Sequence, residues 1–403
     1  MAAARHGGHD SSCTLSSRTC ETASMKPLDV TIVAHDVGTI GGMERQLGAL
    51  SQGLLDAGIR VTVIARQCGL APHPLLTVHR VRTPSRPFPL AYPLFALFGS
   101  WTLHRHRSGV VQSTGAILMS AVDCVAVHFC HHAYLELGVG PVPGAPGRLR
   151  RLSAVVSQRM ALLAERLCYR RTRVRSFIAV SPGVRDEMRR HFPDLADRVQ
   201  TITHGVDGER FKPDPAARRA IRAGYGFAAD DLVAVFVGGD WKRKRLGHAI
   251  DAIAQTERWK LLVVGGGHRT SYEQRAGDLA IDDRVCFAGV TDDVPAHLAA
   301  GDVFLLPTEY ETFCLVAFEA AAVGLPVLVT RVSGPELLVE PGINGDFLDA
   351  DVRRTARLLD GYADRERRQA HGEAARARAC LFTWEQAIAA HISLYERLAR
   401  ATS

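Results

Sequence analysis

Short apolar runs rich in β-branched residues alternate with helical segments along almost the whole chain. The first examples are residues 28–36 (LDVTIVAHD), a helical segment over 41–58, and residues 60–66 (RVTVIAR). This order is typical of βαβ units, in which crossover helices join parallel strands. Each run is apolar on both faces, as expected for a strand buried between two layers of helices. The sequence therefore predicts an α/β fold built on parallel sheets.

The pattern begins again near residue 232 and so divides the chain in two. Strand-like runs occupy residues 109–114, 124–128 and 176–181 before that point, and residues 232–239, 260–267, 284–289, 302–308 and 326–332 after it. Between the two sets, residues 204–215 (HGVDGERFKPDP) have the Gly, Pro and charge content of a linker. At 403 residues the chain is also too long for one ordinary core. We therefore predict two Rossmann-like lobes with a boundary near residue 205.

The predicted organisation has four parts. Residues 1–25 are polar and small, with no apolar stretch that could serve as a signal peptide, and are expected to be a disordered tail. Residues 26–205 form an amino-terminal lobe, on the acceptor side, and residues 206–380 a carboxy-terminal lobe, on the donor side. Residues 381–403 have apolar residues at helical spacing, and we expect this helix to pack back toward the amino-terminal lobe.

Composition narrows the choice of partners. The net charge of +7 favours anionic partners such as phosphates or acidic lipid headgroups, but it is too small to imply nucleic acid. RNP, zinc-finger and helix-turn-helix signatures are absent from the sequence. The nine cysteines are scattered without CxxC spacing, which favours reduced thiols in a cytoplasmic protein over a disulfide framework.

Two segments raise the question of membrane contact. Residues 88–101 are apolar, but they contain Pro89 and Pro93 and fall short of the roughly 20 residues that span a bilayer. We expect them to be packed in the interior; the alternative is a loop that enters a membrane surface or forms a hydrophobic acceptor groove. Residues 148–175 are helical in pattern and rich in arginine. They form either a solvated helix flanking the sheet or a basic amphipathic helix on an anionic membrane.

The most informative stretch is residues 302–330 (DVFLLPTEYETFCLVAFEAAAVGLPVLVT), which predicts a buried strand, a turn, a helix and a second strand. Gly324 ends the helix and Pro326 opens the next strand. In parallel α/β sheets, ligands bind at this strand-to-helix end. The N-terminus of a helix presents free N–H groups and a partial positive charge, which suit a diphosphate.

Two glutamates in this stretch are candidate ligand contacts. Glu311 precedes the helix and Glu319 lies within it, so fully helical spacing would separate them by about 12 Å. A retaining glycosidase needs its two carboxyl groups about 5 Å apart and an inverting one within about 10 Å. The pair is therefore expected to accept hydrogen bonds from hydroxyls at the two ends of one extended ligand.

The sequence here resembles glycosyltransferase family 4, whose fold, GT-B, has two Rossmann-like lobes with parallel sheets facing a central cleft. The E-x7-E motif of that family is matched by residues 311–319 (ETFCLVAFE). The resemblance implies that Glu319 binds the ribose hydroxyls of a nucleotide-sugar donor and that Glu311 binds the transferred sugar.

The resemblance also implies that the backbone of Phe313, Cys314 and Leu315 cradles the sugar and the diphosphate. The family usually has Gly where this chain has Cys314. The extra side chain is expected to narrow the choice of sugar, and its thiol is a candidate site for covalent inhibition.

A basic turn follows the strand at residues 235–247 (VFVGGDWKRKRLG). Such a run is often a solvated face, but cations at the end of a strand suit a departing diphosphate as its charge grows. The family has an Arg and a Lys here, and alignment on V-G-x-D places them at Arg243 and Lys244. Some members carry their Arg directly after the glycine, where this chain has Gly239.

The amino-terminal half supplies the rest of the expected site. Gly41 and Gly42 permit close backbone approach to a ligand, and they match a GG-x-E loop of the family near the donor phosphates and the acceptor. His128 ends a strand-like run, and the resemblance supports it as a contact to the donor sugar. Residues 128–132 (HFCHH) lack the separated ligand pairs of a zinc site, so no metal is expected. His204 replaces a common Asn of the family and is expected to matter little, because it belongs to the linker.

Weaker matches extend the resemblance over nearly the whole chain after residue 29. One of them implies that the loop Val290–Asp293 approaches the nucleotide base. The run at residues 263–269 (VVGGGHR) lacks the full GxGxxG pattern, and no acidic residue is clearly placed for an NAD ribose. Both observations argue against a dehydrogenase.

Taken together, these features predict a retaining glycosyltransferase that moves a hexose from a UDP- or GDP-sugar to a hydroxyl of a glycan or lipid-linked glycan. Arg243, Lys244 and the helix N-terminus assist departure of the diphosphate, so neither a metal nor a cofactor besides the co-substrate is expected. We expect a cytoplasmic protein, with peripheral association with an anionic inner membrane surface left open. The alternatives are a non-catalytic protein that binds sugar nucleotides or membranes, and a sugar-nucleotide epimerase on the same scaffold.

Overall fold

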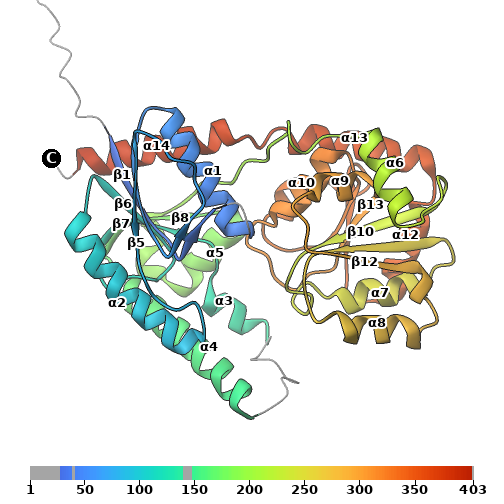
Figure 1. The fold of residues 1–403 in the computed structure, drawn as a ribbon, viewed down its shortest axis with the longest axis horizontal. Helices are drawn as coiled ribbons and strands as arrows, with labels where there is room; N and C mark the ends of the chain where they lie inside the picture. Colours follow the sequence, from blue (N-terminus) through green and yellow to red (C-terminus); the bar gives the residue numbers. More distant parts are fainter. Residues whose placement is uncertain (1–27, 39–40, 139–147, 402–403) are drawn as a thin grey trace, which may run out of the picture.

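The computed structural model of the protein describes residues 28–38, 41–138 and 148–401. It has two α/β lobes side by side (Figure 1). The expected disordered tail, residues 1–25, lies outside the described residues. In the described part of the chain, no helix is both long and apolar enough to cross a membrane.

The amino-terminal lobe is built on a parallel sheet. Within the described residues it has seven strands, in the order β5-β3-β1-β6-β7-β8-β9. They are β1 (Asp29–Val33), β3 (Arg60–Ala65), β5 (Leu76–Arg80), β6 (Val110–Thr114), β7 (Val122–Val127), β8 (Val174–Ala179) and β9 (Val199–Thr201). Two short strands, β2 (Asp36–Val37) and β4 (Gln67–Cys68), pair separately. The helices of this lobe are α1 (Gly42–Asp56), α2 (Phe88–His106), α3 (His131–Glu136), α4 (Arg148–Cys168) and α5 (Pro182–His191).

The carboxy-terminal lobe repeats the architecture. In the described part of the chain its parallel sheet has six strands, in the order β12-β11-β10-β13-β14-β15. They are β10 (Leu232–Val237), β11 (Trp259–Val264), β12 (Val285–Gly289), β13 (Val303–Leu306), β14 (Val327–Thr330) and β15 (Gly345–Leu348). The helices are α6 (Pro215–Gly224), α7 (Leu246–Ala254), α8 (Arg269–Asp278), α9 (Val294–Ala299), α10 (Leu315–Val323), α11 (Pro335–Leu338), α12 (Val352–Gly361) and α13 (Arg365–Ala379). Both sheets confirm the prediction of parallel α/β lobes.

The chain crosses between the lobes twice, and the two crossings lie side by side. The backbone N–H of Val206 donates to the carbonyl of Phe382 at 2.9 Å. A Cβ at Gly205 would fall 2.3 Å from the backbone nitrogen of Trp384, so only glycine allows this approach. After the second crossing, α14 (Trp384–Arg400) runs along the amino-terminal lobe beside α1 (Figure 1). There Tyr395 donates to Gln112 Oε1 at 2.7 Å.

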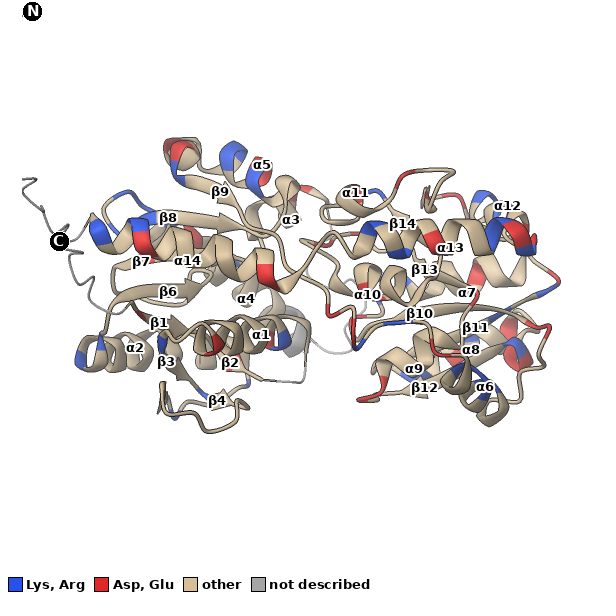
Figure 2. Ribbon diagram, turned by 90° about the horizontal axis from the view of Figure 1, so that it is seen from above, with Lys and Arg blue, Asp and Glu red and all other residues tan. Residues whose placement is uncertain are grey.

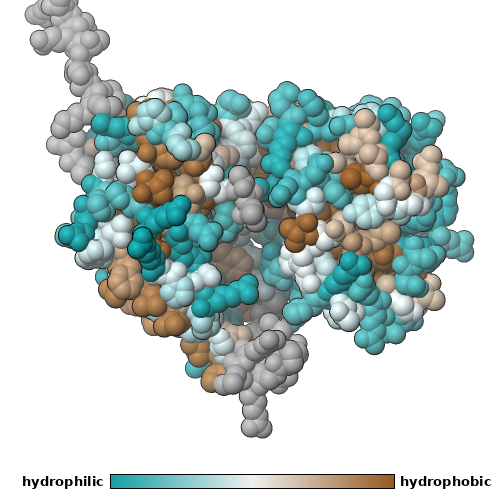
Figure 3. Space-filling view, in the orientation of Figure 1, coloured by the Kyte–Doolittle hydropathy of each residue, from teal (hydrophilic) through white to brown (hydrophobic). Residues whose placement is uncertain are grey.

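The apolar segment at residues 88–101 is a helix and not the alternative loop, and it is buried on one side only, not throughout as expected. It forms most of α2, because Pro89 lies in the first turn, where a missing N–H costs no hydrogen bond. Phe95 and Leu103 face the core, whereas Leu97 and Trp101 on the opposite side are 55% and 56% exposed. Figure 3 shows this apolar surface along the lower left edge of the molecule, where α2 lies next to α4.

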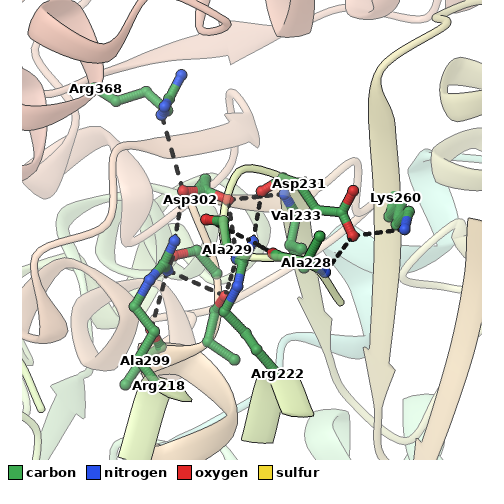
Figure 4. Close-up of polar contacts among 12 residues, drawn as sticks. Arg218, Arg222, Ala228, Ala229, Asp231, Val233, Lys260, Ala299, Asp302 and Arg368 are labelled. Carbon is green, nitrogen blue, oxygen red and sulfur yellow. Dashed lines mark hydrogen bonds and ion pairs between the residues drawn. The ribbon is translucent and has the colours of Figure 1, made fainter. Parts of the chain in front are cut away.

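A buried polar network holds the far end of the carboxy-terminal sheet (Figure 4). Asp302, just before β13, accepts from Arg218 Nη2 at 2.8 Å and from the backbone N–H of Val233 in β10 at 2.8 Å. Arg222 is buried beside it and donates to the carbonyl of Asp231 at 2.6 Å. These contacts tie α6 to both central strands.

Replacing Asp302 with Ala is expected to lower the free energy of unfolding by about 3 kcal/mol or more, because Arg222 would remain buried without its carboxylate. Urea denaturation measures the change. The matched control is Glu273→Ala, which breaks the exposed ion pair with Arg269 and should cost about 0.5 kcal/mol or less. Equal losses in the two variants would contradict a structural role for the network.

Candidate functional site

A cavity of about 530 Å³ lies between the two lobes. From the amino-terminal lobe and the first crossing it is lined by Gly42, Met43, Arg45, Gln46, His128, Phe129 and His204. From the carboxy-terminal lobe it is lined by Val237, Gly238, Gly239, Asp240, Arg243, Lys244, Val294, Glu311, Thr312, Phe313, Cys314, Leu315, Val316 and Glu319. The structure therefore brings together nine of the ten site residues expected from the sequence. The tenth, Gly41, caps α1 beside the cavity with a φ of 91°.

Glu311 lies in a cluster with the two expected cations. Its Oε1 is 2.8 Å from Lys244 Nζ and 3.1 Å from Arg243 Nη1. Burial opposes ionisation of Glu311, but the two cations outweigh it, so the pKa of the carboxyl is below its ordinary value. A Cβ at Gly238 would fall 2.2 Å from Lys244 Cδ, so this glycine lets the lysine side chain lie across the end of β10.

The basic turn divides its four cations between different environments. Lys242 is exposed to solvent, and Arg245 precedes α7 and pairs with Glu309 at 3.9 Å. Lys244 is buried, and Arg243 is half-buried. The side chains that reach the cavity are thus the two selected from the sequence.

Glu319 forms an ion pair across the cleft. Its Oε1 is 3.1 Å from Arg45 Nη2 of α1, whereas its buried Oε2 has no hydrogen-bond partner among the described residues. Burial raises the pKa of this carboxyl, and Arg45 and Arg210 oppose the shift without cancelling it. Buried polar atoms are nearly always hydrogen-bonded, so the free oxygen is suited to accept from a ligand.

The N-terminus of α10 points into the cavity. Cys314 is its N-cap and has a left-handed backbone, with φ of 61° and ψ of 54°. This conformation explains why glycine suits the position, since an L-residue there is strained. Cys314 is buried, and burial raises the pKa of its thiol to about 12. The thiol is therefore not ionised at neutral pH, which argues against the expected covalent-inhibition site.

His204 was expected to matter little as a linker residue, but the structure places it in the cavity wall. It is buried, lines the cavity and lies parallel to His128, with 5.4 Å between ring centroids.

The side chains of the run at residues 128–132 do not all face the cavity. His128 lines the cavity, whereas Nδ1 of His132 lies 2.6 Å from Oε2 of Glu165. Of the loop expected near the base, Val290 is 78% exposed, and the neighbouring Val294 reaches the cavity.

The sequence reasoning missed Arg45 and Gln46 as well as His204. Gly42, Arg45 and Gln46 have i, i+3, i+4 spacing, so they share one face of α1. That spacing could have identified both side chains once Gly42 was selected. His204 carried no comparable signal.

A polar contact closes one edge of the cleft. Tyr310 from the carboxy-terminal lobe donates to Glu187 of α5 at 2.9 Å. Burial raises the pKa of Glu187 to about 7, and the hydrogen bond from Tyr310 opposes part of that shift. The ring of Tyr310 also meets Phe129, with centroids 5.0 Å apart. The lobes thus touch beside the cavity as well as at their crossings.

Two Rossmann-like lobes with parallel sheets and a cationic cavity between them are the architecture of the GT-B fold, and comparison with solved structures agrees. The structure superimposes on a solved glycosyltransferase, WaaG, involved in lipopolysaccharide biosynthesis, with a TM-score of 0.76. That comparison covers 92% of this chain and 98% of the other, and its 21% identity shows the fold alone.

Sequence comparisons give the family. Residues 40–210 match the model described as Glycosyltransferase Family 4, and residues 231–361 match Glycosyl transferases group 1. A D-inositol 3-phosphate glycosyltransferase of Xylanimonas cellulosilytica is 28% identical over 89% of this chain and 92% of its own length. A GDP-mannose-dependent alpha-(1-6)-phosphatidylinositol monomannoside mannosyltransferase of Mycobacterium tuberculosis is 33% identical over 45% of this chain and 51% of its own length. The chain belongs to glycosyltransferase family 4 and is a transferase enzyme.

The backbone at Cys314 gives a test of the site. Cys314→Gly should keep the free energy of unfolding within about 1 kcal/mol of wild type, whereas Cys314→Val should lower it by about 2 kcal/mol, because a β-branched residue is strained in this conformation. Urea denaturation measures both. Thermal shifts with UDP-glucose and GDP-mannose should follow the same order. Equal stability of the two variants would show that the left-handed backbone does not constrain this position.

Proposed function

We propose that the protein transfers a hexose from a UDP- or GDP-sugar to a hydroxyl of a glycan or lipid-linked glycan, with retention and without a metal. One observation carries the proposal: a single cavity combines paired cations, a helix N-terminus and unpaired hydrogen-bonding atoms. The first two suit a diphosphate and the third suits hydroxyls. The GDP-mannose dependence of the mycobacterial relative supports a donor of this class.

Retention is supported by the state of the carboxylates. An inverting transfer needs a general base to activate the acceptor hydroxyl. Among the described lining residues the carboxylates are those of Asp240, Glu311 and Glu319, and each forms an ion pair with Arg or Lys. The low pKa of Glu311 makes it a poor base as well. The cavity also holds His128 and His204, but burial lowers the pKa of His128 to about 4 and the pKa of His204 well below its ordinary value, so both are weak bases. Attack from the face that the diphosphate leaves does not require a carboxylate base, since the departing phosphate oxygen can accept the proton.

Metal independence is supported by the charge that the protein itself supplies. The cations of Arg243 and Lys244 outnumber the one buried carboxylate between them, and the α10 N-terminus adds a partial positive charge. In this proposal they stabilise the leaving diphosphate as its charge grows.

Lys244→Met is expected to lower kcat about a hundredfold, because it removes a cation from the departing diphosphate. The assay measures sugar transfer from the donor that gives the largest thermal shift. Lys242→Met, the exposed neighbour in the same basic run, is the matched control and should change kcat less than about twofold. Wild-type activity should survive EDTA. Strict dependence of activity on Mg²⁺ or Mn²⁺, or an equal decrease of kcat in both variants, would contradict the proposed mechanism.

A lipid-linked acceptor and peripheral attachment to an anionic membrane are supported by the exposed surface of α2 and α4. We call this surface the apolar face; its members are Leu90, Leu97, Phe98 and Trp101 of α2 and Leu152, Val156, Leu163 and Leu167 of α4. A helix that is apolar on all sides is normally buried, yet α2 has one side open. The exposed apolar side of α2 is therefore expected to contact another apolar surface, such as a membrane or a second protein.

The positive charge around the apolar face favours an anionic membrane as its binding partner. The sequence has no acidic residue between Asp56 and Asp123, a stretch that includes all of α2. Figure 2 shows α2 with blue at its end and no red. Arg105 lies 4.7 Å from the centre of the Trp101 ring, and Arg159 and Arg166 are exposed between the leucines of α4. Aromatic and aliphatic side chains flanked by arginines suit the boundary of an anionic bilayer.

The protein should sediment with phosphatidylglycerol vesicles and much less with phosphatidylcholine vesicles, and high salt should weaken the binding. The double variant Leu97→Glu, Trp101→Glu should bind about tenfold more weakly, because it places charge against the bilayer. Ile343→Glu, an equally exposed apolar residue on the other lobe, is the control and should bind as wild type. A dimer that hides the apolar face, with no vesicle binding, would overturn this part of the proposal.

A further inference from the structure

A tyrosine of the carboxy-terminal lobe packs against the amino-terminal lobe beside the cavity. Tyr310 lies in the loop between β13 and α10, yet its ring meets those of Phe129 and Tyr134 edge to face, with centroids 5.0 and 5.4 Å apart. The residue is only 4% exposed. The position of this loop therefore depends on the surface of the other lobe.

The Tyr310 hydroxyl makes two hydrogen bonds to the amino-terminal lobe. It donates to Oε2 of Glu187 in α5 at 2.9 Å and accepts from the backbone N–H of Cys130 at 3.3 Å. A carboxyl group can accept such a bond whether or not it is ionised, so the contact does not require a charge on Glu187. One oxygen atom thus carries two hydrogen bonds between the lobes.

The backbone of Tyr310 supports a cation of the cavity. Its carbonyl accepts from Nη1 of Arg243, and Glu311, the next residue, accepts from the same nitrogen at 3.1 Å. In the same loop, Thr308 Oγ1 donates to Oε1 of Glu311 at 3.3 Å. A single residue therefore joins the amino-terminal lobe to the Arg243 guanidinium.

The two ends of Tyr310 depend on different parts of the molecule. The bond between its carbonyl and Arg243 lies within the carboxy-terminal lobe, whereas both bonds of its hydroxyl exist only while the lobes are in contact. Two domains of one chain are expected to move relative to one another unless a large apolar interface joins them. Contact between the lobes consequently fixes the loop that supports Arg243, and separation of the lobes releases it.

We propose that Glu187 and Tyr310 are positioning residues: their contact between the lobes fixes the loop between β13 and α10 and so holds Arg243 in place for the departing diphosphate. This inference rests on the proposed nucleotide-sugar function and deepens it, because it makes the leaving-group site depend on contact between the lobes. Neither residue is among the described residues that line the cavity, so both act through Arg243 and not on the donor itself.

The test compares the affinities of UDP and GDP with those of UDP-glucose and GDP-mannose by isothermal titration calorimetry. A bare nucleoside diphosphate resembles the departing group, because its terminal phosphate carries the charge that develops during transfer. Tyr310→Phe keeps the ring that meets Phe129 and Tyr134 and removes only the hydroxyl. For whichever base binds, this variant should bind the nucleoside diphosphate about tenfold more weakly and the sugar nucleotide less than about threefold more weakly.

Substitutions of Glu187 test the partner of the hydroxyl. Glu187→Leu should reproduce the selective loss, whereas Glu187→Gln should stay within about threefold of wild type, because its amide oxygen can still accept from Tyr310. The double variant Glu187→Leu, Tyr310→Phe should lose no more affinity than Tyr310→Phe alone, since both substitutions break the same hydrogen bond. Additive losses in the double variant would overturn the inference.

Tyr362 supplies a control of the same chemistry. It is buried in the carboxy-terminal lobe, donates to Oδ2 of Asp346 at 2.9 Å and is not among the described residues that line the cavity. Tyr362→Phe should lower the melting temperature and leave the affinities for both classes of nucleotide unchanged. A Tyr310→Phe variant that weakens both classes equally, or neither, would overturn the inference, as would the same selective loss in Tyr362→Phe. Failure of the wild-type protein to bind any of the four nucleotides would overturn the proposed function itself, and this inference with it.

Discussion

The structure depends on one constraint, the common direction of the strands in each sheet. Parallel strands place every following loop at the same edge, and the two lobes turn those edges toward each other. Strand β13 shows the consequence at its two ends. Asp302 at the beginning holds arginines that fasten the lobe, whereas Glu311 beyond the end gathers the cations that face the ligand cavity. One short apolar strand thus separates a purely structural polar cluster from a functional one.

Much of the fold and most of the site residues of the carboxy-terminal lobe could be predicted from the sequence, because the signals for both are local in the sequence. The alternation of apolar runs and helical segments indicates parallel strands, and Glu311, Lys244 and Cys314 lie in the segments that join a strand to the next helix. His204 was missed because its role depends on how the lobes meet, and the same contact supplies the partner of Arg45, which is Glu319 of the other lobe. Helical spacing from Gly42 could have indicated the position of Arg45 but not its partner, whereas a histidine in a linker gives no such indication.

The exposed side of α2 shows a different limit of sequence reasoning. An apolar segment of this length indicates burial, and its inner residues are indeed buried against the sheet. Periodicity cannot reveal the open side, because a helix that is apolar all round has no polar stripe to mark its orientation. Only the packing of α2 beside α4 distinguishes the half that meets the protein from the half that meets its surroundings.

The second crossing between the lobes has a consequence for how the chain folds during synthesis. Leu394, Tyr395 and Leu398 of α14 belong to the same apolar cluster as Leu47 and Leu54 of α1, although α14 follows the whole carboxy-terminal lobe in sequence. The amino-terminal lobe therefore leaves the ribosome first but cannot close its core until α14 emerges. The carboxy-terminal lobe is continuous in sequence and can be complete earlier. Among the two lobes, the one translated first is thus the one that finishes last, with part of its sheet uncovered in the interval.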